Sequence, residues 1–114
     1  RLSILAKAKT HYQSVLAADP KPIEIEEWGG RYFVRPQISV KKKMEIQQKL
    51  TSDNKMDEGL ALTVIYYLCQ EDGEGCFTKP ELTEIVRSVD PDVLIRVAGE
   101  IADMQPTADD LEKN

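Results

Sequence analysis

The sequence predicts an α+β fold, predominantly α-helical, in which about five helices pack with one β-hairpin at residues 22–36. Apolar residues recur at helical spacing in five segments, and one further segment alternates apolar and polar residues on either side of a Gly-Gly pair. The 114 residues are the length of one domain. We expect a single globular domain over residues 1–104 and an acidic, flexible tail over residues 105–114.

The first helix is expected at residues 4–17, with Ser3 as its N-cap. Its apolar residues lie at helical spacing and are Leu5, Ala8, Tyr12, Val15 and Leu16. Asp19-Pro20-Lys21-Pro22 ends this helix, because a residue before proline is pushed out of the α region.

The hairpin follows, with Gly29-Gly30 as a two-residue loop, since glycine accepts the positive φ angles of a primed turn. This loop places Ile25 opposite Val34. It also places Glu24 opposite Arg35, so that opposite charges pair. One face then carries Ile23, Ile25, Tyr32 and Val34, and the other carries Trp28 and Phe33.

Four more helices are expected after the hairpin. Ser39 begins the helix at residues 40–50, and the most apolar helix follows at residues 57–69. A broad apolar stripe on the latter should form the centre of the core: Met56, Leu60, Ala61, Val64, Ile65 and Leu68. Thr78 and Glu81 have the spacing of a capping box that begins the next helix, and Asp90-Pro91 separates it from the last.

Composition excludes several classes of protein. With 41% hydrophobic and 31% charged residues the chain is not a disordered protein, and no apolar run reaches the ~18 residues of a membrane helix. One histidine and two cysteines leave little material for a catalytic triad or a metal site, so we expect no enzyme and no cofactor. Cys69 and Cys76 are expected to be free thiols in a reducing cytosol, the alternative being a disulfide across the intervening turn.

The charge is divided between the two halves of the chain. Residues 1–55 hold 11 Lys or Arg and 6 Asp or Glu, a balance of +5, whereas residues 56–114 hold 4 and 14, a balance of −10. Such a division predicts complementary surfaces that meet within the fold or between copies. The net charge of −5 argues against a nucleic-acid partner.

Two groups of side chains are candidate partner-binding residues. Exposed aromatic residues often anchor interfaces, which favours Trp28 and Phe33 on the hairpin, together with the neighbouring Arg31. The alternative for these aromatics is packing against a helix. Lys41, Lys42 and Lys43 oppose the helix macrodipole and could dock an acidic partner; the alternative is a solvated face.

The segment from Gln70 to Glu81 imitates an EF-hand calcium loop. Asp72, Glu74, Gly75 and Glu81 stand at the third, fifth, sixth and twelfth positions of such a loop. The first position is the neutral Gln70, however, and glycines that end one helix and a capping box that begins the next explain the same residues. A calcium-binding module is therefore the alternative function.

The order of these features over residues 22–104 resembles the tail assembly chaperones of long-tailed (siphovirus-type) bacteriophages. An acidic and apolar strand runs into Trp28-Gly29-Gly30, and the strand from Tyr32 to Pro36 follows. A charged helix begun by Ser39, a long apolar helix, the segment from Asp72 to Thr78 and two closing helices complete the order.

The resemblance implies a role in assembly. Such proteins bind the tape measure protein, keep it soluble and help recruit tail tube subunits in the cytoplasm of the bacterial host. It implies no catalytic residue and no cofactor. The partners it implies are the tape measure and tail tube proteins, with self-association of the chaperone, and neither nucleic acid nor a membrane is among them.

Overall fold

The computed structural model describes residues 3–105 and has five α-helices and a three-stranded antiparallel sheet, which confirms the predicted α+β class. The elements in chain order are α1 (Ile4–Leu16), β1 (Lys21–Ile25), the 3-10 helix η1 (Glu26–Trp28), β2 (Gly30–Val34), α2 (Val40–Leu50), α3 (Met56–Tyr67), β3 (Leu68–Cys69), the 3-10 helix η2 (Lys79–Glu81), α4 (Leu82–Ser88) and α5 (Pro91–Asp103). The predicted tail at 105–114 lies outside the described residues, apart from Gln105.

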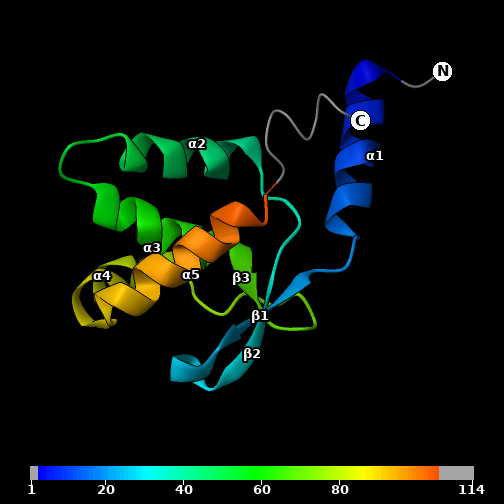
Figure 1. Cartoon of the computed structure of the whole chain (residues 1–114). Helices are drawn as coiled ribbons and strands as arrows, with labels where there is room; N and C mark the ends of the chain where they lie inside the picture. Colours follow the sequence, from blue (N-terminus) through cyan, green and yellow to red (C-terminus); the bar gives the residue numbers. More distant parts are fainter. Residues whose placement is uncertain (1–2, 106–114) are drawn as a thin grey trace.

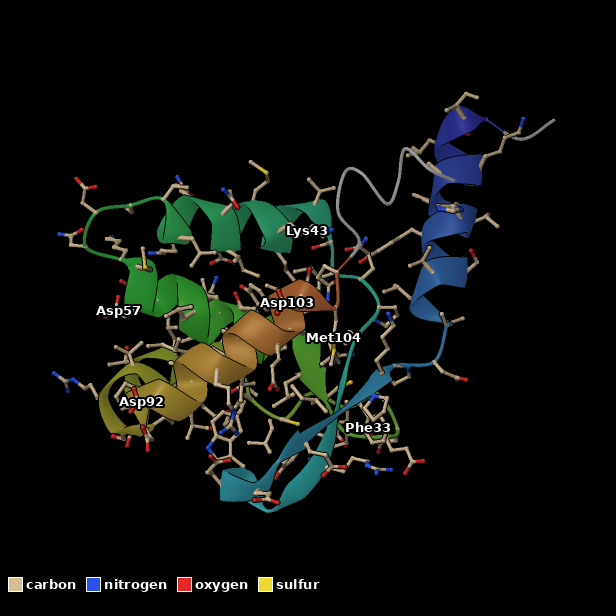
Figure 2. All side chains as sticks on the ribbon, viewed as in Figure 1. Phe33, Lys43, Asp57, Asp92, Asp103 and Met104 are labelled. Carbon is tan, nitrogen blue, oxygen red and sulfur yellow. The ribbon has the colours of Figure 1, made fainter. Side chains whose placement is uncertain are left out.

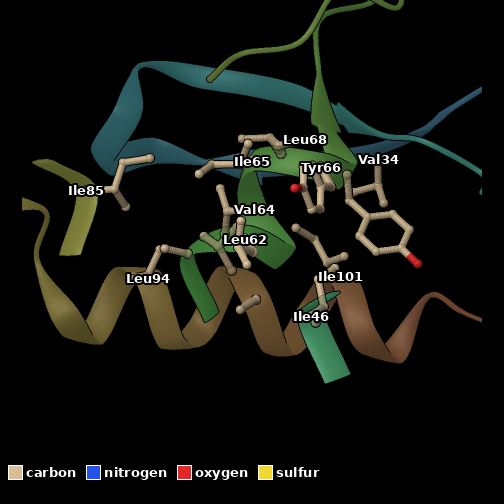
Figure 3. Packing of buried hydrophobic residues seen from close by; sticks show 14 of the residues in the cluster. Val34, Ile46, Leu62, Val64, Ile65, Tyr66, Leu68, Ile85, Leu94 and Ile101 are labelled. Atoms are coloured by element: carbon tan, nitrogen blue, oxygen red, sulfur yellow. The ribbon is translucent and has the colours of Figure 1, made fainter. Parts of the chain in front are cut away.

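Helix α3 is the centre of the fold, with α2, α4 and α5 packed around it (Figure 1). Its residues from Ala61 to Tyr67 are all buried, and Figure 3 shows Leu62 and Val64 packed against Leu94 and Ile101 of α5. The predicted stripe does form the centre of the core through Ala61, Val64, Ile65 and Leu68. Burial extends beyond it to Leu62, Tyr66 and Tyr67, because other helices surround α3. Met56, expected in the core, is 57% exposed.

The third strand was not predicted, because its two residues continue the apolar run of α3. Leu68 turns extended at φ −77° and ψ 130°, and β3 pairs with β2 through Val34 opposite Leu68 and Phe33 opposite Cys69. Next to the pair of Val34 and Leu68, the Arg35 amide donates to the Tyr67 carbonyl at 2.9 Å. Pairing with a distant strand, rather than local propensity, ends the helix.

The hairpin forms where predicted but in a different register. Residues 26–28 make a 3-10 turn before Gly29 and Gly30, which have the expected positive φ angles of 102° and 133°. The strands therefore pair Ile25 with Gly30 and Glu24 with Arg31, so the predicted partners Val34 and Arg35 are wrong. The predicted face of Ile23, Ile25, Tyr32 and Val34 is confirmed, since a shift of an even number of residues keeps each side chain on its side.

The predicted helix starts are confirmed. The Ser3 hydroxyl accepts from the Ala6 amide at 3.1 Å, and the Ser39 hydroxyl accepts from the Lys42 amide at 3.3 Å. The Asp90 carboxylate caps α5 by accepting from the Asp92 amide at 2.9 Å. These signals are local in sequence, which is why they could be read without tertiary information.

Helix α1 stands apart from the rest of the molecule (Figure 1). It has no buried residue, and Ile4, Leu5 and Leu16 are 79%, 65% and 44% exposed. An isolated helix of 13 residues is marginal in water, because most helical stability comes from packing of an apolar face. The apolar face of α1 therefore lacks a packing partner within residues 3–105.

Candidate protein-binding site

A concave surface lies between α1 and the body of the molecule. Two adjoining cavities of about 570 Å³ and 260 Å³ share the lining residues Tyr12, Gln37, Ile38 and Ser39. We call this surface the α1–α2 groove. One wall is α1, and the other is formed by the segment after β2 and the first turns of α2, with α3 and the 75–79 segment as its floor.

The groove combines apolar and cationic side chains. Its apolar lining comes from five segments of the chain and includes Tyr12, Leu16, Ile38, Val40, Tyr66 and Phe77. Arg35, Lys42, Lys43 and Lys79 also line it. Clefts with apolar walls and a few charged groups are the usual form of a recognition site.

A hydrogen-bonded network fixes the floor of the groove. The Tyr66 hydroxyl donates to the Glu45 carboxylate, which also pairs with Lys79 at 2.7 Å. Hydrogen bonds from Lys79 and then Tyr66 lower the pKa of Glu45, and the same carboxylate raises the pKa of Lys79. Lys79 is thus neutralised by its partner. Arg35, Lys42 and Lys43 make no ion pair within residues 3–105, so they set the charge of the groove.

The three predicted lysines divide in the structure. Lys43 and Lys42 line the groove, and Lys42 also lies 5.2 Å from the centre of the Tyr66 ring. Lys41 is exposed and lines neither cavity. Figure 2 places Lys43 on the part of α2 nearer to α1. The sequence did not indicate Arg35 or α1 as part of a binding site, because their proximity to α2 depends on the fold.

The three candidate residues of the hairpin, Trp28, Arg31 and Phe33, do not line the α1–α2 groove. Figure 2 shows Phe33 on the sheet, and this residue is half-buried. Trp28 does not share a strand face with it: Trp28 lies in η1, packs against the core and meets Phe77 edge-on at 5.7 Å between ring centres. Trp28 therefore packs inward, against the core and Phe77, a residue of the segment between β3 and η2. The exposed Arg31 pairs with Glu24 at 2.7 Å across the strands.

A second ion pair ties the hairpin turn to α5. The Arg96 guanidinium donates to both oxygens of Glu27 at 2.7 Å. This double hydrogen bond lowers the pKa of the Glu27 carboxyl to about 2. The hairpin carboxylates Glu24 and Glu27 are thus engaged with arginines, Glu24 with Arg31 across the strands and Glu27 with the distant Arg96.

The two cysteines are free thiols, as predicted. Cys69 is buried and Cys76 is half-buried beside the sheet. Burial raises the pKa of both thiols, that of Cys76 to about 11. Both are therefore protonated and weakly reactive at neutral pH.

The segment resembling a calcium loop makes local hydrogen bonds. Asp72 accepts from the Glu74 amide at 2.9 Å, and Glu81 accepts from the Thr78 amide at 2.7 Å and its hydroxyl at 3.0 Å. Within residues 3–105 no group of three or more His, Cys, Asp or Glu side chains has the geometry of a metal site. The capping box accounts for Glu81, and a local turn accounts for Asp72. None of the helices in these residues has the length and apolarity to cross a membrane.

We expect Glu81→Ala to lower the free energy of unfolding by about 1 kcal/mol, because it removes the reciprocal cap of η2 and α4. Glu81→Gln keeps an acceptor and should cost less. Urea unfolding with and without millimolar calcium measures both effects. A calcium-dependent rise in the wild-type midpoint that Glu81→Gln abolishes would instead support a calcium ligand.

Comparison with known proteins gives a likeness of fold. No protein-family model and no curated protein sequence matches the chain. Among solved structures, a similar arrangement of helices around a small sheet is found in a phage assembly protein.

That structure is the tail assembly chaperone of bacteriophage HK97. The TM-score is 0.64 and the identity 20%, and the match covers 89% of this chain and 98% of the other. The predicted resemblance to tail assembly chaperones is thereby confirmed as a likeness of fold.

Proposed function

We propose that this protein is a phage tail assembly chaperone that binds the tape measure protein, keeps it soluble and helps to recruit tail tube subunits. The observation that carries the proposal is the fold shared with the HK97 tail assembly chaperone over 89% of the chain. The role requires no catalytic step and no cofactor, and it places the protein in the cytoplasm of the bacterial host.

The surface of the molecule supports this role. A chaperone of this kind must cover apolar helices of its partner while it remains soluble itself. The α1–α2 groove and the apolar face of α1 offer an apolar surface bordered by charges. Such patches on a soluble protein mark sites of interaction with other polypeptides.

The distribution of ion pairs supports self-association. Residues 3–105 contain four ion pairs, and among these only Lys49–Glu58 joins a cation of residues 1–55 to an acid of residues 56–114. Within residues 3–105 most cations of the basic half are therefore not paired with acids of the acidic half. Head-to-tail contact between copies would pair them, and repeated contact of this kind produces an open assembly along a long partner.

We predict weak self-association that decreases as the salt concentration rises, since it depends on exposed charges. Reversal of Lys41, Lys42 and Lys43 to glutamate should leave the fold intact and reduce assembly. Sedimentation of both proteins at low and high ionic strength measures this, with circular dichroism as the control for folding. A wild-type monomer at both salt concentrations would contradict the prediction.

Co-expression with the tape measure protein of the same phage tests the function. We expect the soluble fraction of the tape measure protein to rise when this chain is present. An unrelated acidic protein of similar size, expressed to the same level, is the control. If the tape measure protein is equally insoluble with both, the proposed function is wrong.

A further inference from the structure

We propose that the α1–α2 groove binds an acidic amphipathic helix of the partner protein, with apolar side chains between α1 and α2 and carboxylates on Arg35, Lys42 and Lys43. The inference rests on the proposed function, because it names the kind of segment that this chaperone would cover. The inference identifies the surface that covers the partner segment and the charge of that segment.

The exposed apolar residues concentrate on the two helices that form the walls of the groove, and two of them, Leu16 and Val40, line its cavities. Seven large apolar side chains are strongly exposed in residues 3–105, and five of them lie on α1 or the first half of α2: Ile4, Leu5, Leu16, Val40 and Met44. On α2, Val40, Lys43 and Met44 share one face, since residues three and four apart are neighbours. A single partner segment between these walls would cover apolar surface on both.

A helix is the partner shape that the groove fits. Two helical walls with apolar residues at helical spacing accept a third helix by ridges-into-grooves packing. This arrangement is also the usual mode by which a groove recognises an amphipathic helix. Helix α1 would gain from the partner the packing that it lacks within residues 3–105.

The charge of the walls selects an acidic segment. Helices α1 and α2 together carry six lysines and one glutamate. That glutamate, Glu45, already pairs with Lys79, so the excess positive charge is uncompensated at Arg35, Lys42 and Lys43. Carboxylates along the polar edge of a bound helix would complement it. The concave shape and apolar lining favour a polypeptide over a flat membrane surface or a nucleic acid.

A synthetic peptide provides a direct probe. A fluorescent helix of about 18 residues, with leucines at i, i+3, i+4 and i+7 and glutamates elsewhere, is titrated with the full chain by anisotropy. The controls are a scrambled peptide of the same composition and a peptide with lysine in place of glutamate. We expect the patterned acidic peptide to bind at least about tenfold more tightly than either.

Lys43→Glu and Lys41→Glu form a matched pair of variants. Both reversals lie in the first turn of α2 and change the helix macrodipole alike, but only Lys43 lines the groove. We expect Lys43→Glu to weaken peptide binding about five- to tenfold and Lys41→Glu to weaken it less than about twofold. Equal effects of the two reversals would overturn the proposal.

Hydrogen exchange tests whether the peptide occupies the groove. The amides of α1 should exchange rapidly in the unbound protein and slow several-fold when the peptide binds. Binding without a change in α1 would overturn the proposal. So would equal or tighter binding, dependent on Lys43, of anionic vesicles or of a single-stranded oligonucleotide.

These measurements separate the inference from the proposed function. If the peptide binds the groove but the tape measure protein stays insoluble on co-expression, the proposed chaperone function is wrong and the proposal of helix binding by the groove stands. If the wild type and Lys43→Glu solubilise the tape measure protein equally and neither binds the peptide, the proposed chaperone function stands and the proposal of helix binding by the groove is wrong.

Discussion

We expect Leu62→Ala to lower the free energy of unfolding by about 2 to 5 kcal/mol, a large part of the stability of a small domain. Leu62 is 0% exposed at the centre of α3, between the helices that pack around it (Figure 3). Removing its isobutyl group leaves a cavity that the surrounding helices cannot fill completely. Urea unfolding followed by circular dichroism measures the change.

Met56→Ala is the matched control, since it shortens another long apolar side chain of the same helix. Met56 is 57% exposed, and we expect its replacement to change the free energy of unfolding by less than about 0.5 kcal/mol. Similar costs for the two substitutions would mean that Met56 is buried in the core, as the sequence alone predicted. The burial pattern of α3 in the structure would then be wrong.

The second large effect is expected for Gly59→Ala, which should lower the free energy of unfolding by about 1 to 3 kcal/mol. A Cβ atom at residue 59 would lie 2.7 Å from Cδ2 of Leu50 and 2.9 Å from the Leu50 backbone nitrogen. A side chain can rotate away, but the backbone cannot, so α2 must move from α3. This cost exceeds the gain in helix propensity from glycine to alanine.

Gly99→Ala has the opposite predicted sign. Gly99 is exposed on α5, and no atom lies within 4 Å of an added Cβ. Alanine should therefore raise the free energy of unfolding by about 0.5 to 1 kcal/mol through helix propensity alone. The two variants can be compared in one set of denaturation curves. Stabilisation by both would show that α2 and α3 do not approach as closely as the structure has them.

Local signals made much of the fold predictable. Ser3, Ser39, Asp90 and the Thr78–Glu81 box mark helix starts through hydrogen bonds within a few residues of the chain, and all four are present in the structure. The face of the hairpin that carries Ile23 and Val34 was also predictable, because strand alternation survives an even shift of register.

Long-range contacts determined what the sequence could not reveal. The hairpin turn forms a 3-10 helix whose Trp28 packs on Phe77 and whose Glu27 pairs with Arg96, both remote in sequence. The end of α3 becomes a strand because β2 lies beside it. In each case a tertiary contact overrides the local preference.

The candidate site was predictable only in part. The run of three lysines drew attention to the start of α2, but the sequence could not separate Lys41 from Lys42 and Lys43 or add Arg35 to them. It also predicted the apolar face of α1 as part of a packed domain, whereas the structure leaves this face exposed. Both differences depend on where α1 lies relative to α2.

The mass of the complex formed by purified protein and tape measure protein tests the central claim most directly. Light scattering after size exclusion at low salt should give a soluble particle with several copies of this chain on each tape measure chain. Separate elution of the two proteins, or a complex with a single copy, would contradict a chaperone that covers its partner by repeated binding.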